Sequence, residues 1–324
     1  MESQPEGHSK TEDSNRAFTA SGPVAVAVIV VTFQNEADID PLVQSLRGEV
    51  DDQSLRVIIS DNSSSDRTVH AARRHSDVVV VETGGNYGYS GAINRAMAFV
   101  GEAEAILILN PDLTVGPGAI AHLVARLSRA GTEGIVVPAI ENPDGSIALS
   151  LRYEPTLSRR LGDAVFGSKW PTRPSALSET VRNRRLYLSP HRIEWATGAA
   201  LLVSRTVSDR LGSWDERFFL YSEETDYFRR ARDLGVQIWF EPAARVTHKE
   251  AGSGRSAQLV ALTVVNAVRY IEKHQPRSAA AHRAILALHE LRRWRDPEHR
   301  VARTILLDRA GWDSLPAATK GSRS

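Results

Sequence analysis

Three acidic residues follow a largely apolar run in the segment FFLYSEETDYFRR, where Glu223, Glu224 and Asp226 lie close together. Clustered carboxylates raise one another's pKa, which suits a general base or a metal ligand. Acidic side chains also favour the first turn of a helix, because they complement the helix dipole. The dipole accounts for one acid at this place but not for three, so both interpretations stay open.

A further carboxylate follows the aliphatic run ILIL, because the chain continues as NPDLTV with Asn110 and Asp112. At a strand end, such a carboxylate can face a diphosphate through Mg²⁺ or Mn²⁺, which prefer carboxylate and phosphate oxygens. Asn-Pro-Asp is also a good turn former. His248, in ARVTHKEAGSGRS, would complete a metal site only if the fold brings it to Asp112.

Two other strand ends carry polar residues. Asp61, in SDNSSSDRT, could accept a hydrogen bond from a nucleobase or a ribose, whereas Asp66 fits a helix N-cap. The stretch GGNYGYSGAINRA is similar to a phosphate-binding loop before a helix. Its spacing of Gly85, Gly88 and Gly91 matches neither the dinucleotide-binding pattern nor the Walker A pattern. The alternative is a tight strand-to-helix turn with small residues for close packing, which accounts well for Gly84 and Gly85.

Aliphatic strands alternate with amphipathic helices along the first half of the chain. The expected strands are VAVAVIVVTF, LRVIIS, DVVVVET and AILILN. Continuous aliphatic strands separated by helices predict a mostly parallel sheet covered on both faces, in the doubly wound α/β class. In such sheets, ligands bind at the carboxyl ends of the strands, where these polar residues lie.

The second half of the chain changes in character. Residues 156–190 are rich in Arg, Ser and Pro and are expected to form a loop, and VQIWFEPAARVTH is expected to form a pair of strands. We expect a disordered tail over residues 1–22, an α/β domain over residues 23–254, a C-terminal helical extension over residues 255–308 and a flexible tail over residues 309–324.

Composition limits the function. The 324 residues include 40 Lys and Arg against 39 Asp and Glu, so the net charge of +1 gives no argument for a nucleic-acid partner. The absence of cysteine excludes disulfides, thiolate zinc sites and Cys nucleophiles, and it fits a reducing compartment. The N-terminus lacks the apolar core of a secretory signal, and no run is long enough to span a bilayer. We therefore expect a cytoplasmic location.

Five segments in this order resemble the family-two inverting glycosyltransferases of the GT-A fold, in the bacterial rhamnosyltransferase-like branch. They are VVTFQNE, SDNSSSD, NYGYSGAINRA, LNPDL and the series WATGAALLVSR…WDERFFLYSEETD…H. The resemblance covers residues 24–254, and the helical segment with RYIEKH is also similar. It implies transfer of rhamnose or another hexose from a dTDP- or UDP-sugar to a hydroxyl of a saccharide, lipid-linked or small-molecule acceptor, assisted by Mg²⁺ or Mn²⁺.

The resemblance also assigns residues. The implied substrate-binding residues are Thr32, Phe33, Asn35, Asp61, Asn86, Gly88, Gly91, Asn94, Asn110, Trp195, Gly198 and Ala199. Asp112 and His248 would hold the metal, with Asn110 in place of the first acid of the family's Asp-x-Asp motif. Glu224 would be the catalytic base, beside Glu223, and Asp226 is the fallback.

One departure concerns the base, because the family has Glu-Asp where this chain has Glu223-Glu224. The extra methylene of glutamate shifts its carboxylate by about 1 Å, and such a displacement can slow a reaction. A non-catalytic sugar-nucleotide binder is therefore one alternative. A sugar nucleotidyltransferase is another, although its glycine-rich basic signature is missing from TFQNEADID after the first strand.

The last helices mix arginines with apolar residues. The residues concerned are Arg283, Arg292, Arg293, Arg295, Arg300 and Arg303, with Ile285, Leu286, Leu288 and Trp294. Such a helix could lie on an anionic membrane at the inner face and would suit a lipid-linked acceptor. A packed helix with a solvated basic face is the alternative. A homodimer is a further expectation that the sequence does not decide.

Overall fold

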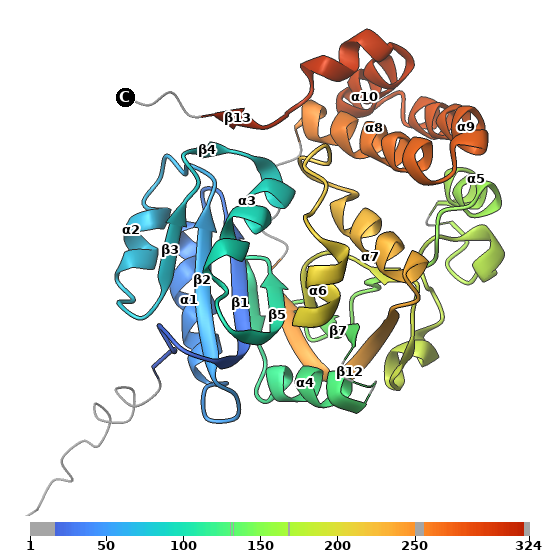
Figure 1. The fold of residues 1–324 in the computed structure, drawn as a ribbon. Helices are drawn as coiled ribbons and strands as arrows, with labels where there is room; N and C mark the ends of the chain where they lie inside the picture. The colour runs from blue at the N-terminus through green and yellow to red at the C-terminus, as the bar shows by residue number, and fades with distance from the viewer. Residues whose placement is uncertain (1–16, 130, 132, 168, 250–255, 321–324) are drawn as a thin grey trace, which may run out of the picture.

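The computed structural model describes residues 17–129, 131, 133–167, 169–249 and 256–320. Within these residues, a nine-stranded sheet has the order β3-β2-β1-β5-β11-β7-β12-β6, with β9 beside β12 (Figure 1). Its strands are β1 (Val24–Thr32), β2 (Leu55–Asp61), β3 (Val79–Glu82), β5 (Ala103–Leu109), β6 (Leu113–Val115), β7 (Gly134–Glu141), β9 (His191–Arg192), β11 (Ala200–Ser204) and β12 (Gln237–His248).

The sheet is mostly parallel, as predicted. β1 runs parallel to β2 and β5, β2 to β3, and β7 to β12, whereas β11 lies antiparallel between β5 and β7. The segment predicted as two strands is the single strand β12, with a register shift between Glu241 and Arg245. Pro242 lies in this irregularity, where its missing N–H interrupts no ladder bond and the strand bends without ending.

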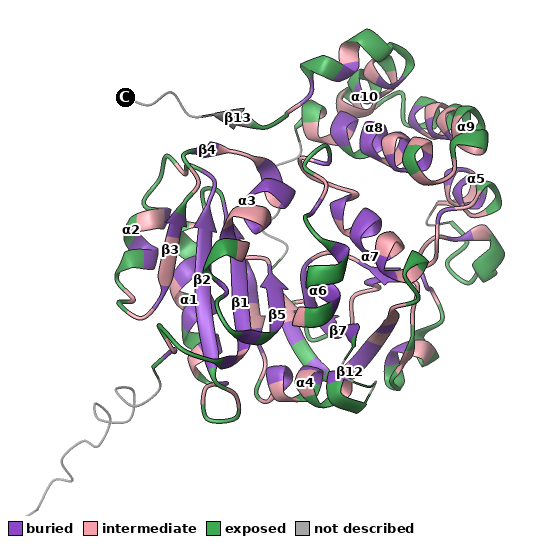
Figure 2. Ribbon diagram, viewed as in Figure 1, coloured by how far each residue is buried: buried purple, intermediate pink, exposed green. Residues whose placement is uncertain are grey.

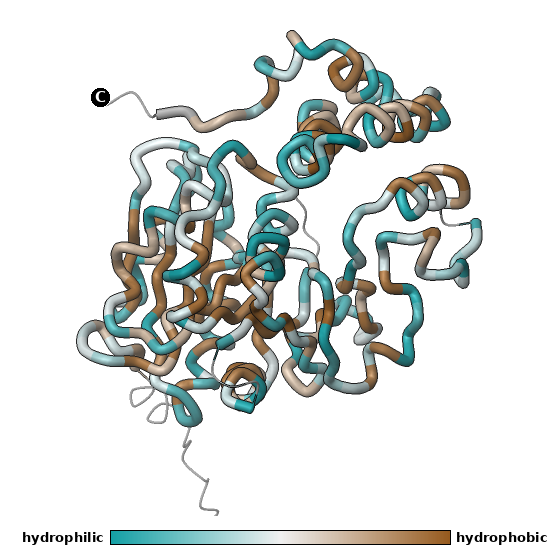
Figure 3. Tube along the Cα trace, turned by 45° about the vertical axis from the view of Figure 1, so that its right-hand side comes forward, coloured by the Kyte–Doolittle hydropathy of each residue, from teal (hydrophilic) through white to brown (hydrophobic). Residues whose placement is uncertain are grey.

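Helices cover both faces of the sheet (Figures 1 and 2). They are α1 (Glu36–Arg47), α2 (Thr68–Arg73), α3 (Gly88–Ala96), α4 (Ala119–Arg129), α6 (Arg205–Leu211) and α7 (Glu223–Asp233). Alternate residues of β1 enter opposite cores: Val28 packs with α1, α2 and α4, and Ile29 with α3, α6 and α7. Strands buried on both faces explain the unbroken aliphatic runs, which appear brown in Figure 3.

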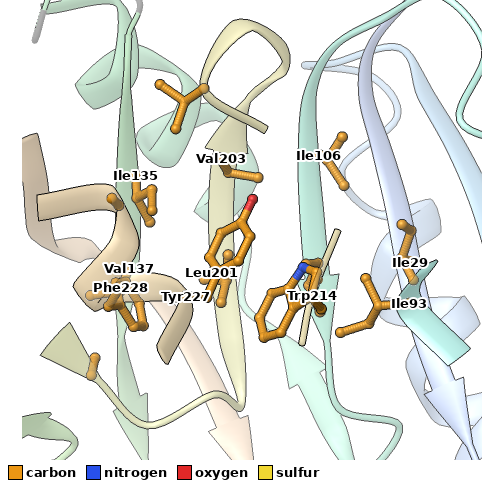
Figure 4. Close-up of a cluster of buried hydrophobic side chains, with 14 of the residues drawn as sticks. Ile29, Ile93, Ile106, Ile135, Val137, Leu201, Val203, Trp214, Tyr227 and Phe228 are labelled. Atoms are coloured by element: carbon orange, nitrogen blue, oxygen red, sulfur yellow. The ribbon is translucent and has the colours of Figure 1, made fainter. Parts of the chain in front are cut away.

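The helix that carries the acidic cluster, α7, is fixed to the sheet by aromatic packing. Tyr227 and Phe228 are fully buried over β11 and β7 (Figure 4). Trp214 stacks on Tyr227 with ring centroids 4.2 Å apart and an interplanar angle of 9°. This core determines which side of α7 faces the sheet.

The C-terminal extension has a core of its own. Helices α8 (Ala257–His274) and α10 (Pro297–Leu307) and the short η6 (Arg309–Ser314) share buried apolar residues, and α9 (Ala279–Arg292) packs against them. The expectation of a flexible tail over residues 309–324 differs from the structure. Trp312 and Leu315 are buried, and β13 (Thr319–Lys320) pairs with β4 (Gly85–Asn86). These two apolar side chains are enough to fix the segment to the fold, although its overall composition is typical of a flexible tail. Residues 321–324 lie outside the described chain.

Other boundaries also differ. Residues 17–22 belong to the fold, because Phe18 is buried and its amide donates to Asp77 over 2.9 Å. The rest of the predicted N-terminal tail and the predicted boundary at residues 254–255 lie outside the described residues. Within the predicted loop, the chain forms α5 (Leu157–Phe166), whose N-terminus is capped by Thr156 and which lies against α9.

Candidate active site

The ends of β1 and β2 are held together by one buried carboxylate. Thr32 and Asp61 are paired in register, and the Thr32 hydroxyl donates to Asp61 Oδ1 over 2.9 Å. Ser64 donates its amide to Oδ2 over 2.8 Å and its hydroxyl to Oδ1 over 2.5 Å. Asp61 thus positions the loops that follow both strands, while its contact with a nucleobase stays a prediction.

The loop after β1 leaves an aromatic ring exposed. Phe33 is 46% exposed, and its amide donates to the side chain of Asn35 over 2.9 Å. Gln34 has φ 61° and its amide donates to Ser64, so hydrogen bonds to the neighbouring loop hold a left-handed residue. A ring presented at a strand end suits stacking on a base.

The glycine-rich stretch is built for close packing. Gly88 has φ 70°, and a Cβ there would lie 2.0 Å from the carbonyl oxygen of Phe219. The amide of Tyr89 donates to that same oxygen over 2.7 Å. Asn86 accepts from the Gly88 amide over 3.0 Å, and Asn62 donates to the Gly88 carbonyl over 3.0 Å. This geometry favours the tight-turn interpretation, and it brings the segment before α7 against the loop.

Two other predicted loop residues brace α3. A Cβ on Gly91 would lie 2.6 Å from Cβ of Tyr87, so a larger side chain does not fit without movement. Asn94 donates to the Trp214 carbonyl over 2.9 Å and accepts from the Trp214 amide over 2.8 Å. Asn94 therefore ties α3 to the segment that leads to α7.

Strand pairing brings the two predicted metal ligands together. Leu113 and His248 are partners in the β6–β12 ladder, and His248 Nε2 lies 3.1 Å from Asp112 Oδ1. The turn alternative has a direct comparison in the chain, because Asp144 stands in a second Asn-Pro-Asp segment. Asp144 bonds within its own turn, to the Ser146 amide over 2.9 Å, whereas Asp112 reaches across the sheet.

This pair suits a divalent cation. Adjacent ligands of an octahedral Mg²⁺ at 2.0–2.1 Å are about 3 Å apart, and carboxylate oxygen and imidazole nitrogen are acceptable donors. In the described part of the chain, no group of three or more His, Asp or Glu residues could hold a metal.

A strained turn precedes the acidic cluster. Tyr221 and Ser222 both have φ 69°, a left-handed conformation that is costly outside glycine. Glu223 and Glu224 follow as the first residues of α7, and each has a buried Oε2 without a hydrogen-bond partner in the described structure. Strained backbone beside unpaired buried carboxylates is typical of a functional site.

The two glutamates differ in electrostatics. Burial raises the pKa of Glu224 above its usual value, while backbone amides and Arg152 partly oppose this effect. The pKa of Glu223 is raised further, because repulsion from Glu224 adds to the effect of burial. Glu224 therefore ionises first, and it does so nearer to neutral pH than an exposed glutamate, which suits a general base.

The segment that leads into β11 lies beside Glu224. A Cβ on Gly198 would lie 3.2 Å from Cβ and 3.3 Å from Cγ of Glu224, so the glycine makes room for this side chain. The indole of Trp195 donates to the Tyr153 carbonyl over 2.9 Å. The Ala199 carbonyl accepts from the Asn110 amide over 2.8 Å, which joins the base to the strand end that carries Asp112.

The third predicted acid, Asp226, has a different environment. It is fully buried, with Arg230 at 2.9 Å, His274 at 2.7 Å and Lys273 at 2.5 Å. Burial opposes its ionisation, but bonds from His274 and Lys273 outweigh burial and lower its pKa. A carboxylate bonded to Arg230, Lys273 and His274 is poorly suited to accept a proton, and Asp226 instead fastens α7 to α8.

Two further residues escape sequence reasoning. Asn266 of α8 is fully buried and donates to the carbonyls of Leu220 over 2.8 Å and Tyr221 over 3.1 Å. Tyr89 donates its hydroxyl to the Gly198 carbonyl over 3.3 Å. Burial raises the pKa of Tyr89 well above its usual value, and the nearby acids Glu223, Glu224 and Asp112 add to this shift. The sequence signal that could have identified Asn266 is a single polar residue within the apolar run LTVVNAV. No sequence signal points to Tyr89.

Comparisons with known proteins indicate the family to which the chain belongs. A family model described as Glycosyl transferase family 2 matches residues 27–185. An N-acetylglucosaminyl-diphospho-decaprenol L-rhamnosyltransferase from Mycobacterium tuberculosis is 34% identical over 237 residues, which cover 70% of this chain and 76% of that protein. The hexosyltransferase Agl10 of low-salt glycan biosynthesis, from Haloferax volcanii, is 28% identical over 217 residues, covering 66% of this chain and 63% of that protein.

The solved structures agree on the fold. GalNAc-T7, solved with UDP, GalNAc and Mn²⁺, matches with a TM-score of 0.57 and 16% identity over 90% of this chain and 57% of that chain. Fold and site thus define a glycosyltransferase of the GT-A class. Within that class, the chain belongs to glycosyl transferase family 2 and its rhamnosyltransferase-like branch.

We predict that Asn266→Ala lowers kcat for sugar transfer by about ten- to a hundredfold, because it frees the strained turn that positions Glu224. The KM for the donor should stay within about twofold. The measurement is steady-state kinetics across pH, since a displaced Glu224 also shifts the rising limb of the pH profile. Gln258→Ala, at an exposed position of the same helix, is the matched control. Equal kinetics in both variants would exclude this role.

Proposed function

We propose that the protein transfers a sugar, with inversion, from a nucleoside-diphosphate sugar to an acceptor hydroxyl. The observation that carries the proposal is the half-buried Glu224, which lines a cavity and whose inner oxygen, Oε2, is buried without a hydrogen-bond partner in the described structure. Backbone contacts connect it to the strand end with Asp112 and His248. A base and a cation-binding pair on either side of one contact between strand ends would supply what direct displacement requires.

The mechanism follows from these positions. Glu224 accepts the proton of the acceptor hydroxyl, and the oxygen attacks the anomeric carbon while the bond to the nucleoside diphosphate breaks on the opposite face. Asp112 and His248 would hold Mg²⁺ or Mn²⁺, which when bound neutralises charge on the leaving diphosphate. Glu223 stays protonated beside Glu224, so the pair carries a single negative charge before proton transfer.

The donor that we propose is dTDP- or UDP-linked, with rhamnose as the sugar. The name of the mycobacterial relative supports rhamnose, and the exposed Phe33 ring supports a stacked base. The acceptor is proposed as a saccharide or a lipid-linked saccharide on the same ground.

Replacing each of the two glutamates separately by glutamine distinguishes their roles. Glu224→Gln should reduce transfer by about 10²–10⁴-fold, because it removes the base. The fold should be retained, since a neutral amide is less costly to bury than an unpaired carboxylate. Glu223→Gln should keep most of the activity and the same rising limb of the pH profile, because Glu223 is already neutral there. Transfer rates from pH 5 to 9 test both, and full activity in Glu224→Gln would remove it as the base.

The metal pair can be tested by ligand binding alone. We expect UDP- or dTDP-rhamnose to raise the melting temperature more with Mn²⁺ than with EDTA, because a bound ligand stabilises the fold it binds. Asp112→Ala should abolish this Mn²⁺-dependent increment together with transfer. Asp144→Ala changes the other Asn-Pro-Asp segment and should leave both intact. An undiminished increment in Asp112→Ala would reject the pair as a metal site.

We also propose peripheral contact with an anionic membrane through the corner between α9 and α10. Leu288, Leu291 and Trp294 are 44%, 48% and 54% exposed, and Arg292 and Arg295 lie beside them. Other residues of the predicted surface face inward: Leu286 is buried, and Arg283 donates to the Leu306 carbonyl. Among the described residues, no helix could cross a bilayer, so any contact of this part of the chain would lie at the surface.

Vesicle flotation tests this contact. The protein should float with vesicles that contain anionic lipid and much less with neutral ones, because arginines add attraction to the burial of Trp294. A Leu291→Ser/Trp294→Ser variant should float at least several-fold less. Leu234 is also exposed but lies at the C-terminus of α7, away from this corner, so Leu234→Ser is the control. Equal flotation of all three proteins would discard the proposal.

A further inference from the structure

Tyr89, the second residue of α3, lies between the two chemical halves of the site. Its hydroxyl donates to the carbonyl of Gly198 over 3.3 Å, and Gly198 makes room for the side chain of Glu224. The following carbonyl, of Ala199, accepts from the amide of Asn110 just after β5. The phenol oxygen is thus one hydrogen bond away from the backbone that joins the proposed base to the metal pair.

The electrostatics of Tyr89 indicate the same position. Burial raises the pKa of its phenol well above the usual value, and the charges of Glu223, Glu224 and Asp112 add to the shift. The hydroxyl therefore lies within the fields of both the proposed base and the proposed metal ligand, and it stays neutral and protonated at neutral pH. A neutral hydroxyl can donate one hydrogen bond and accept two.

The ring of Tyr89 is held in place by packing. Its amide donates to the carbonyl of Phe219 over 2.7 Å, and its ring packs edge-on against Trp214, with centroids 6.4 Å apart and an interplanar angle of 81°. Trp214 is in turn stacked on Tyr227 of α7 (Figure 4). Contacts at the backbone and on the ring fix the position of the hydroxyl, which is what a specific hydrogen bond to a substrate requires.

The bond to Gly198 leaves the hydroxyl with capacity for a second partner. Its length of 3.3 Å exceeds the roughly 2.5–3.0 Å that is usual for a hydroxyl donating to oxygen, so the bond is weak. Tyr89 is only half-buried, and after donating to Gly198 its oxygen keeps both lone pairs. The phenol can therefore accept a hydrogen bond from a substrate without giving up its present contact.

The part of the substrate nearest to this oxygen would be the donor sugar. In the proposed reaction, the anomeric carbon lies between the acceptor oxygen at Glu224 and the diphosphate at Asp112 and His248. Tyr89 approaches this place from the glycine-rich loop, which Asn62 ties to the end of β2 by a hydrogen bond of 3.0 Å. This is the side of the site where the nucleotide is expected, so Tyr89 would meet the transferred sugar rather than the acceptor.

We infer that Tyr89 selects the donor by accepting a hydrogen bond from one ring hydroxyl of the transferred sugar. Its own proton is directed to Gly198, which leaves the lone pairs for the sugar. A donor that lacks this hydroxyl leaves the phenol oxygen without a partner in a site from which water has been excluded, and it is rejected for that reason. The inference rests on the proposed transfer function and adds a specificity residue to it.

The test combines Tyr89→Phe with altered donors. dTDP-rhamnose, UDP-glucose and UDP-N-acetylglucosamine are first screened for transfer and hydrolysis, and the best of them is then supplied as its single-deoxy analogues. Removal of one particular ring hydroxyl should lower kcat/KM about tenfold more in the wild type than in Tyr89→Phe, because only the wild type loses a bond. Removal of the other hydroxyls should affect both proteins equally. The intrinsic reactivity of each analogue cancels, since the same analogue is compared in two proteins.

Fluorinated donors test the direction of the bond. Fluorine cannot donate a hydrogen bond, so the fluoro analogue at the selected position should be discriminated against as strongly as the deoxy analogue. Recovery of kcat/KM by fluorine in the wild type but not in Tyr89→Phe would overturn the inference, because the sugar would then be the acceptor of the bond.

Tyr87→Phe is the matched control. It removes a hydroxyl two residues earlier in the same loop, from a ring that is covered by the guanidinium of Arg95, and it should keep the wild-type pattern. A common loss for every donor in Tyr89→Phe would make the hydroxyl a structural brace and overturn the inference. If this variant does not fold, thermal stabilisation of the wild type by the deoxy analogues decides, and equal stabilisation by all of them would overturn it too.

The outcomes distinguish the inference from the function on which it rests. Complete absence of transfer and hydrolysis with all three donors would contradict the proposed function. Turnover without a position-specific difference between the wild type and Tyr89→Phe would leave that function standing and reject Tyr89 as a specificity residue.

Discussion

The active site depends on how α8 holds α7. Asp226 is buried on α7 and bonded to Lys273 and His274 of α8, and a buried carboxylate is stable only when such partners replace its water. One turn towards the N-terminus of α8, Tyr270 bonds to Glu154, and one turn further Asn266 binds the strained turn before Glu223. These residues recur at helical spacing, so one face of α8 fixes both the body and the start of α7, which carries the proposed base. The C-terminal extension is therefore part of the site's scaffold.

The two chemical halves of the site are joined by main chain. The carbonyl of Ala199 accepts from the amide of Asn110, so the end of the strand before Asp112 is fixed to the residue after Gly198. Tyr89 bridges the same gap from α3, because its hydroxyl reaches the Gly198 carbonyl and its amide reaches Phe219. The proposed base and metal pair are thus positioned by the ends of β5 and β11, which are more rigid than a free loop.

Sequence patterns predict what depends on local order and miss what depends on packing between distant segments. The sheet is predictable because strands buried on both faces must be aliphatic, and Asp112 is predictable because it ends such a strand. Whether Asp112 meets His248 depends on the β6–β12 register, which spacing does not determine. Asp226 was predicted as a fallback base because its bonding partners on α8, about 50 residues later in the chain, cannot be recognised from the local sequence. The segment with Trp312 and Leu315 was predicted as a tail for a similar reason. Both side chains are buried against residues that lie far away in the sequence, which composition does not reveal.

Glutamate in place of the family's aspartate can be accommodated here by its surroundings. A longer side chain needs either a shifted backbone or more space, and Gly198 provides space, since a Cβ there would press on Cβ and Cγ of Glu224. The left-handed Tyr221 and Ser222 set where α7 begins, and Asn266 stabilises the carbonyl of Tyr221 in that strained state. Glu224 lines the cavity that α8 and α9 help to form. Because the same extension both binds the turn before α7 and lines this cavity, a change in its sequence alters the surroundings of Glu224 from two sides.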